Sequence, residues 1–174
     1  MQDHFAALGH ILHKTEPARR TPLENIDWPK LISKVSTSTP THEETAENLS
    51  LHPHTIAGSG DKKFRVRMET APGWTDLKLL LRTLASVHAR PLLLSMPFDG
   101  QSYDETGISL SARDSYYKRL RAVAQRYHVP LVEFQGHDED PAFLYLHRSH
   151  LTAKGWIYYD RALDDFFHRR LPRS

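Results

Sequence analysis

The sequence predicts an α/β fold in three layers, α/β/α, with a mostly parallel sheet. Two observations predict it. Helical and strand-like patterns alternate after residue 63, in the order helix, strand, helix, strand, helix, and both strand-like runs are short and continuously apolar. Strands buried on both faces have that composition, and strands joined by helices run parallel. The first part of the chain lacks the alternation, so we expect a helical and irregular segment over 1–62 and an α/β part over 63–174.

Two helices are predicted in the first segment. The earlier one has apolar residues at helical spacing, Phe5, Leu8, Ile11 and Leu12. The later one is shorter and centres on Trp28 and Pro29, with the apolar residues Leu23, Ile26, Leu31 and Ile32. From 36 to 62 the chain is rich in Ser, Thr, Pro, His and Gly and has no apolar period, which predicts a long irregular loop.

The first half of the α/β part predicts a helix and a strand. A helix over 73–88 follows from its buried face, Trp74, Leu77, Leu80, Leu81, Leu84 and Val87. Pro91 ends it. The apolar run 92–96 is then a strand buried on both faces, and Pro97 ends that strand. Asp99 and Gly100 predict a turn after it.

The second half repeats the pattern. Ser111, followed by Asp114, predicts the N-terminal cap of a helix that ends near His128. Its buried face is Tyr116 or Tyr117, Leu120, Val123, Ala124 and Tyr127. Residues 131–134 predict a second strand. Thr152 predicts the cap of a last helix, whose apolar face is Trp156, Tyr159, Leu163, Phe166 and Phe167.

Composition excludes several classes of protein. The chain has 23 Lys and Arg against 21 Asp and Glu, a net charge of +2, too small to indicate a nucleic-acid partner. With no cysteine it has no disulfide, thiol nucleophile or iron–sulfur cluster. Neither a membrane-spanning run, a secretory signal nor a nucleotide-binding glycine motif is present, so we expect this chain, taken alone, in the cytoplasm.

Reactive groups in open α/β sheets lie beyond the carboxyl ends of the strands. Two segments qualify, 95–104 after the first strand and 137–150 after the second. His150, directly before the last helix, is our candidate general base, because an imidazole titrates near neutrality. The chain has 12 histidines, and by residue type alone any one of them is more often a surface or packing residue than a catalytic base. His52, His54, His147 and His150 lack the spacing of a metal site, so we expect no metal.

Three segments carry a resemblance. His150-Leu151-Thr152-Ala153-Lys154-Gly155-Trp156 resembles the pattern Asp-x-x-His-Leu-Gly-x-Lys-Gly-Trp of the D-alanyl-lipoteichoic acid biosynthesis protein DltD family. Residues 96–107 resemble that family's Pro-Pro-x-Asn-Gly-x-Tyr-x-Tyr-Thr-Gly segment, and 74–81 its Asp-Leu-x-Leu-x-Leu helix. Collinear similarity extends over roughly residues 24 to 167.

This resemblance implies a fold of the flavodoxin-like kind found in Ser-Gly-Asn-His hydrolases, here incomplete on its N-terminal side. It implies D-alanyl transfer to teichoic acid or a similar cell-envelope polymer, by an extracytoplasmic, membrane-anchored family without a cofactor. The implied partners are that polymer, a D-alanyl carrier or membrane acyltransferase, and the missing N-terminal half of the family domain. The implied substrate-binding residues are Asp99, Gly100, Tyr103, Lys154 and Trp156, and the implied base is His150.

Two departures from the family pattern bear on catalysis. The family's serine nucleophile lies before the region that this chain covers, and Ser59, Ser95 and Ser102 lack the context of a nucleophile. His147 stands where the family has the acid that orients the base. Asp138, Glu139 or Asp140 can take that role, or they form a solvated acidic turn. The alternative to an enzyme part is a diverged, non-catalytic binding or scaffolding module, or a truncated remnant.

Overall fold

The computed structural model of the chain describes residues 26–37, 56–145 and 150–171. Their helices and strands follow one another as α2 (Trp28–Thr37), α4 (Asp61–Thr70), α5 (Gly73–Ser86), β1 (Leu93–Ser95), α6 (Gly100–Glu105), α7 (Leu110–Tyr127), β2 (Leu131–Glu133), the 3-10 turn η1 (Gln135–His137) and α8 (Ala153–Phe167). The predicted alternation of helices and strands after residue 63 is therefore confirmed.

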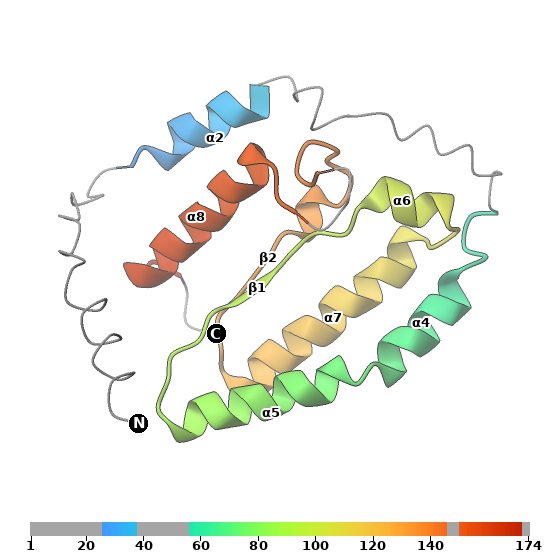
Figure 1. Cartoon of the computed structure of the whole chain (residues 1–174), viewed down its shortest axis with the longest axis horizontal. Coiled ribbons are helices and arrows are strands. Elements are labelled where there is room, and N and C mark those ends of the chain that lie inside the picture. The colour runs from blue at the N-terminus through green and yellow to red at the C-terminus, as the bar shows by residue number, and fades with distance from the viewer. Residues whose placement is uncertain (1–25, 38–55, 146–149, 172–174) are drawn as a thin grey trace, which may run out of the picture.

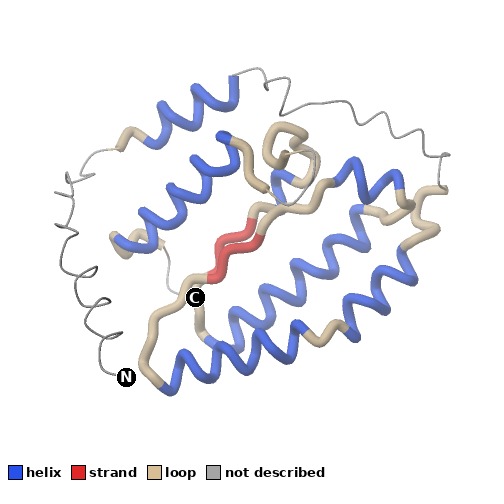
Figure 2. The backbone as a smooth tube through the Cα atoms, viewed as in Figure 1, coloured by secondary structure: helices blue, strands red, loops and turns tan. Residues whose placement is uncertain are grey.

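The sheet consists of β1 and β2 in the described part of the chain, and the two strands are parallel, as predicted (Figure 2). Leu93 lies beside Leu131, and Ser95 beside Glu133. The α/β class is thus observed. Two strands do not define a strand order, so the flavodoxin-like arrangement stays a prediction.

Helices lie on both sides of this sheet: α2 and α8 on one side, α4, α5 and α7 on the other (Figure 1). Side chains alternate along a strand, so Leu93 and Leu131 pack against the cluster of α5 and α7, with Trp74, Leu81 and Leu120. Leu94 and Val132 pack against the second cluster, which contains Phe134, Phe143 and Tyr159. The paired strands therefore separate two hydrophobic cores.

One of the two helices predicted in the first segment is observed. α2 is the later of the two predicted helices, and Asp27 Oδ1 accepts a hydrogen bond from Lys30 N at its start. It lies against α8, where Trp28 Nε1 donates to Asp164 Oδ2 at 2.7 Å. The predicted helix around residues 5–12 lies outside the described residues, as do 38–55 of the predicted loop.

α4 was not predicted, and it begins inside the expected loop 36–62. Its sequence is strongly polar, and a tertiary contact fixes its start: Asp61 accepts from the Ser109 backbone N at 2.7 Å and from Ser109 Oγ at 2.6 Å. The same Ser109 caps α7 by accepting from Ala112 N at 3.2 Å, so the prediction of Ser111 as the cap is wrong.

Two further helix starts lie at the carboxyl ends of the strands. Asp99 and Gly100, expected to form a turn, instead begin the short helix α6, which Asp99 caps. The predicted cap of α8 is confirmed, because Thr152 Oγ1 accepts from Gly155 N at 3.2 Å. Thr152 Oγ1 also donates to Ala142 O at 2.6 Å, which anchors the start of α8 to the loop after β2.

Candidate active site at the carboxyl ends of the strands

The loops after β1 and β2 meet, as the sequence predicts. Gly100 N donates to the backbone oxygen of Asp138 at 2.7 Å, and Phe98 N donates to Asp138 Oδ1 at 2.9 Å. A Cβ at position 100 would lie 2.7 Å from that same Asp138 oxygen, closer than real Cβ atoms approach. Only glycine fits this junction. Asp99 lies beside it, where its Oδ1 accepts from Ser102 N at 3.1 Å.

Asp138 is the most deeply buried acid at the junction, with 4% of its surface exposed. Its Oδ1 accepts from the Tyr117 hydroxyl at 2.5 Å, while its Oδ2 has no hydrogen-bond partner in the described part of the chain. Burial raises the pKa of Asp138 above its ordinary value, although the hydrogen bonds from Tyr117 and Phe98 oppose the rise. A buried acid with one unsatisfied oxygen favours a proton.

Arg113 joins α7 to both loops and is 1% exposed. Its guanidinium donates to Asp104 at 2.7 Å, to Glu139 at 2.5 Å and to the backbone oxygen of Gly100 at 3.1 Å. The acidic run 138–140 is therefore a solvated turn only in part, since Glu139 alone of its three acids is exposed. Asp138 is buried, and Glu139 forms an ion pair.

Asp140 forms a second polar cluster with His137 and Lys154. Its Oδ2 lies 3.2 Å from His137 Nδ1 and 2.7 Å from Lys154 Nζ. Burial alone would raise the pKa of Asp140, but the bonds from Lys154 and His137 hold it below its ordinary value. The His137 ring stacks on Phe143, with centroids 4.3 Å apart. Lys154, predicted to bind substrate, thus bridges the start of α8 to the loop after β2.

The residues predicted to act as acid and base differ in exposure: Asp138 is buried and His150 is exposed. His150 is exposed, and its backbone oxygen accepts from Tyr145 N at 2.8 Å in the short antiparallel bridge that precedes α8. His147 lies outside the described residues. The hydrogen bonds of Asp138 come from Tyr117 and Phe98, so its role as the group that orients His150 stays a prediction.

The remaining predicted binding residues lie at two places. Tyr103 is half-buried between Phe64 and Phe98, with ring centroids 5.9 and 4.8 Å away, and burial raises the pKa of its hydroxyl. The side chain of Trp156 on α8 is 55% exposed. Their binding roles stay predictions.

The three serines considered as nucleophiles differ in their surroundings. Ser95 and Ser102 are buried, and Ser95 Oγ donates to the Met96 backbone oxygen at 3.2 Å. Ser59 is exposed in the turn before α4. Within residues 26–37, 56–145 and 150–171, no three His, Asp or Glu side chains gather as metal ligands. None of the described helices has the length and apolar character to cross a bilayer.

Sequence reasoning missed the part that Arg113 plays at this site, and it named Tyr117 only as a candidate core residue. A signal existed, because Arg113, Tyr117 and Leu120 share one face of a helix at spacings of four and three residues. An arginine on such an apolar face indicates a buried ion pair. His137 carried no comparable signal: it pairs with Asp140, three residues away in a polar loop, and the lysine that pairs with the same carboxylate, Lys154, lies in another element.

Comparison with known proteins adds the family. The profile of the family described as DltD protein matches residues 10–168. Protein DltD of Bacillus subtilis (strain 168) is 32% identical over 97 residues, which are 56% of this chain and 24% of that protein. Protein DltD of Staphylococcus aureus (strain NCTC 8325 / PS 47) is 26% identical over 103 residues, which are 59% of this chain and 25% of that protein.

Each matched segment thus covers about a quarter of the relative's own length. The match to the family profile, in contrast, extends over most of this chain and includes both loops of the site. The resemblance carried by residues 96–107 and 150–156 is thereby confirmed, and the chain belongs to the DltD protein family.

Proposed function

We propose that this chain is the C-terminal part of a DltD-like protein that transfers D-alanine to teichoic acid or a similar polymer of the cell envelope. The observation that carries the proposal is the family match over residues 10–168, together with the meeting of the two motif-bearing loops at one end of a parallel sheet. Enzymes with open α/β sheets react at that end.

His150 is the proposed general base. It precedes α8 and is exposed to solvent, so a substrate can reach it. A neutral histidine at 147 supplies no negative charge to stabilise the imidazolium that forms when His150 accepts a proton. Asp138 is the proposed substitute as the hydrogen-bond acceptor that orients His150, because its Oδ2 has no partner in the described part of the chain. It supplies a negative charge only when ionised, and burial opposes ionisation.

The nucleophilic serine and the oxyanion donors are proposed to come from the missing N-terminal half of the family domain. The edge of β1 that faces away from β2 has no strand beside it in the described part of the chain. Next to it opens an apolar cavity of about 530 Å³, lined by residues that include Phe64, Met68, Trp74, Met96, Phe98 and Tyr116. A further parallel strand would satisfy this edge and cover the cavity, completing a flavodoxin-like sheet.

The other proposed partners follow from the reaction. An acyl transfer needs a D-alanyl donor, either a carrier or a membrane acyltransferase, and an acceptor polymer. The half-buried Tyr103 and the exposed Trp156 are the proposed contacts for these substrates. No cofactor is needed for transfer between an ester and a hydroxyl through a serine.

A specific observation favours a second function. Position 147 holds histidine where the family pattern has the orienting acid. A non-catalytic module that binds the polymer or the acyltransferase does not need that acid, and neither does a truncated remnant.

An assay of esterase and D-alanyl transfer separates these functions. The purified chain is tested alone and mixed with a recombinant N-terminal half of a DltD-like protein. We expect activity in the mixture alone, and a decrease of at least about 10²-fold for His150→Ala, the contribution typical of general base catalysis. His88→Asn is the matched control, since His88 is exposed and lies on the opposite end of the sheet.

Two variants identify the orienting group. Restoring the family acid with His147→Asp should raise the activity of the mixture if position 147 faces the base. Asp138→Asn should lower it if Asp138 has taken the role. Folded protein that is inactive in every mixture, His147→Asp included, contradicts the catalytic proposal and supports the binding module.

A further inference from the structure

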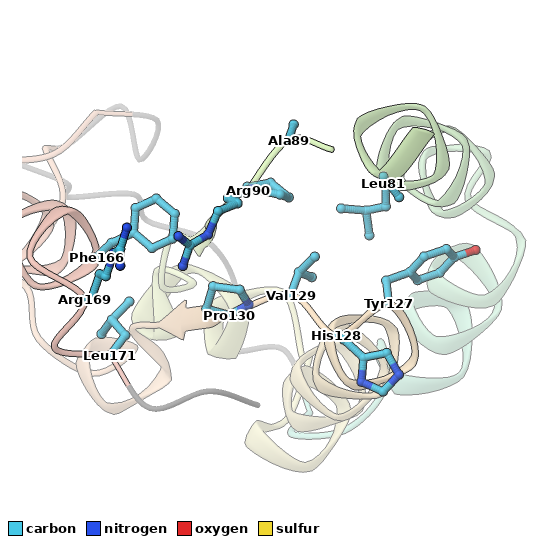
Figure 3. A pocket seen from close by; sticks show the side chains of 12 residues that line it. Leu81, Ala89, Arg90, Tyr127, His128, Val129, Pro130, Phe166, Arg169 and Leu171 are labelled. Carbon is cyan, nitrogen blue, oxygen red and sulfur yellow. The ribbon is translucent and has the colours of Figure 1, made fainter. Parts of the chain in front are cut away.

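A second cavity lies at the other end of the sheet, where β1 and β2 begin. Its volume is about 430 Å³. Residues 89–91 precede β1 and residues 128–130 precede β2, and the ends of α5, α7 and α8 complete its wall (Figure 3). It lies outside both loops of the candidate active site.

The charged side chains that line this cavity are all positive. Arg90 and Arg169 line it, and none of its lining residues is acidic. Figure 3 shows both arginine side chains on the same side of the cavity, next to the ring of Phe166. Arg90 and Arg169 are both exposed, whereas the buried Arg113 forms ion pairs.

Arg90 and Arg169 have no hydrogen bond or ion pair to their guanidinium groups in the described part of the chain. The acids nearest in sequence to Arg169, Asp164 and Asp165, are bonded to Arg170 instead. Two unpaired guanidinium groups in one recess repel each other, and an anion that binds both removes the repulsion.

The backbone supplies an independent observation. The non-glycine residues with positive φ in the described part of the chain are His88, His128 and Arg169, at φ of 56°, 52° and 58°. His128 and Arg169 line the cavity, whereas His88 does not. Glycine is the most stable residue in this conformation. A long basic side chain kept there at a cost in stability indicates that the side chain has a use.

Basic residues at helix ends also have an ordinary explanation, because a cation stabilises the negative end of the helix dipole. That explanation needs a charge near the last turn of a helix. It does not account for Arg90, which lies four residues beyond the end of α5, next to β1. The backbone N–H groups of His128 and Val129 already cap the last carbonyls of α7.

We propose that this cavity binds an organic phosphate, with Arg90 and Arg169 holding the phosphate group. A guanidinium fork matches two phosphate oxygens, and Phe166, Leu171 and Leu81 offer an apolar wall for the rest of the molecule. The site is separate from the proposed acyl-transfer site and does not depend on its activity.

Calorimetric titration of the 174-residue chain with phenyl phosphate, inorganic phosphate and phenol, at fixed ionic strength, tests the proposal. We expect saturable binding of phenyl phosphate, weaker binding of inorganic phosphate and none of phenol. Arg90→Ala and Arg169→Gly should each weaken the binding of phenyl phosphate by about tenfold. Vesicles of phosphatidylglycerol, compared with phosphatidylcholine, distinguish a lipid headgroup from a soluble phosphate: competition with phenyl phosphate assigns the headgroup.

The glycine variants guard against a purely structural effect. Arg169→Gly should raise the melting temperature while it weakens binding, because glycine relieves the left-handed backbone. His88→Gly is the matched control and should raise the melting temperature without changing binding. The proposal is overturned if phenyl phosphate does not bind saturably, if Arg169→Gly binds as well as the parent chain, or if His88→Gly weakens binding equally.

Discussion

The two ends of the parallel sheet use charged side chains differently. At the carboxyl ends of the strands, Arg113, Glu139, Asp140 and Lys154 are bonded to one another or to opposing loops. At the amino ends, Arg90 and Arg169 line a cavity without an acid. The first arrangement holds two loops in place, and the second leaves charge available to a ligand.

This difference shows that a polar or charged residue after a strand is not by itself evidence of a catalytic role. Asp138 and Arg113 lie at the carboxyl ends of the strands, where catalytic groups are expected. Each is nevertheless buried and hydrogen-bonded to neighbouring residues. They fix the geometry in which an exposed group such as His150 can act. Their loss should therefore lower stability first.

Arg113→Ala should have the largest effect on stability. The substitution removes the ion pairs to Asp104 and Glu139, which are weak because both acids are exposed. It also leaves the backbone oxygens of Gly100 and Ile108 without this donor. We expect a loss of about 3 kcal/mol in the free energy of unfolding, measured by urea denaturation. Arg82→Ala, on the exposed surface of α5, is the control and should change stability by less than about 0.5 kcal/mol.

Gly155→Ala should have the next largest effect. A Cβ at position 155 would lie 2.6 Å from the backbone oxygen of Phe143 and 2.9 Å from Leu151 Cδ2, so α8 must move away from the loop after β2. We expect a loss of about 2 kcal/mol. Gly136→Ala is the matched control, because a Cβ there meets nothing within 4 Å. Equal losses in the two variants would show that glycine at 155 is not required by packing.

The helices differ in how far the sequence alone predicts them. The helices at 73–88 and 153–167 were predictable from the helical spacing of their apolar residues, of which Trp74, Leu81 and Tyr159 are buried. The predicted faces are wrong in part, because five of their residues are exposed: Leu80, Val87, Trp156, Leu163 and Phe167. α4 was not, because its stability comes from contacts such as that of Asp61 with Ser109, 48 residues away. Local patterns do not contain such contacts.

The candidate site likewise has a part that the sequence predicts and a part that it does not. The loops that carry it could be predicted, since a short motif and its position after a strand are both local. The pairing of Tyr117 with Asp138, and of Asp140 with Lys154, could not, because each joins separate elements whose approach depends on the packing of the helices. The sequence accordingly suggested a solvated acidic turn as the alternative to an active acid, and the structure shows a buried junction.

Asp138→Asn should change the pH dependence of stability. Because burial raises the pKa of Asp138 in the folded protein, the folded state keeps a proton that the unfolded state has lost, and stability falls as pH rises through the ordinary range of an aspartate. Asparagine does not titrate, so the variant should lack this fall above the ordinary pKa of an aspartate, about 4. Urea denaturation across that range measures it.

The control for this slope is Asp114→Asn, which should act in the opposite direction. The hydrogen bond from Lys118 lowers the pKa of Asp114, so its contribution is present at neutral pH and is lost as pH falls. A slope that Asp138→Asn leaves unchanged would contradict the raised pKa of Asp138.

Lys118→Ala should have the smallest effect and sharpens the comparison within a single helix. Lys118 and Arg113 both lie on α7 and both pair with acids, but the Lys118 side chain is 72% exposed and that of Arg113 is 1% exposed. An exposed pair at i and i+4 contributes little, so we expect a change of less than about 0.5 kcal/mol by urea denaturation. A loss as large as that of Arg113→Ala would mean that the ion pairs themselves stabilise α7. The predicted difference means instead that the burial of Arg113 decides its contribution, because its loss leaves the carbonyl oxygens of Gly100 and Ile108 without this donor.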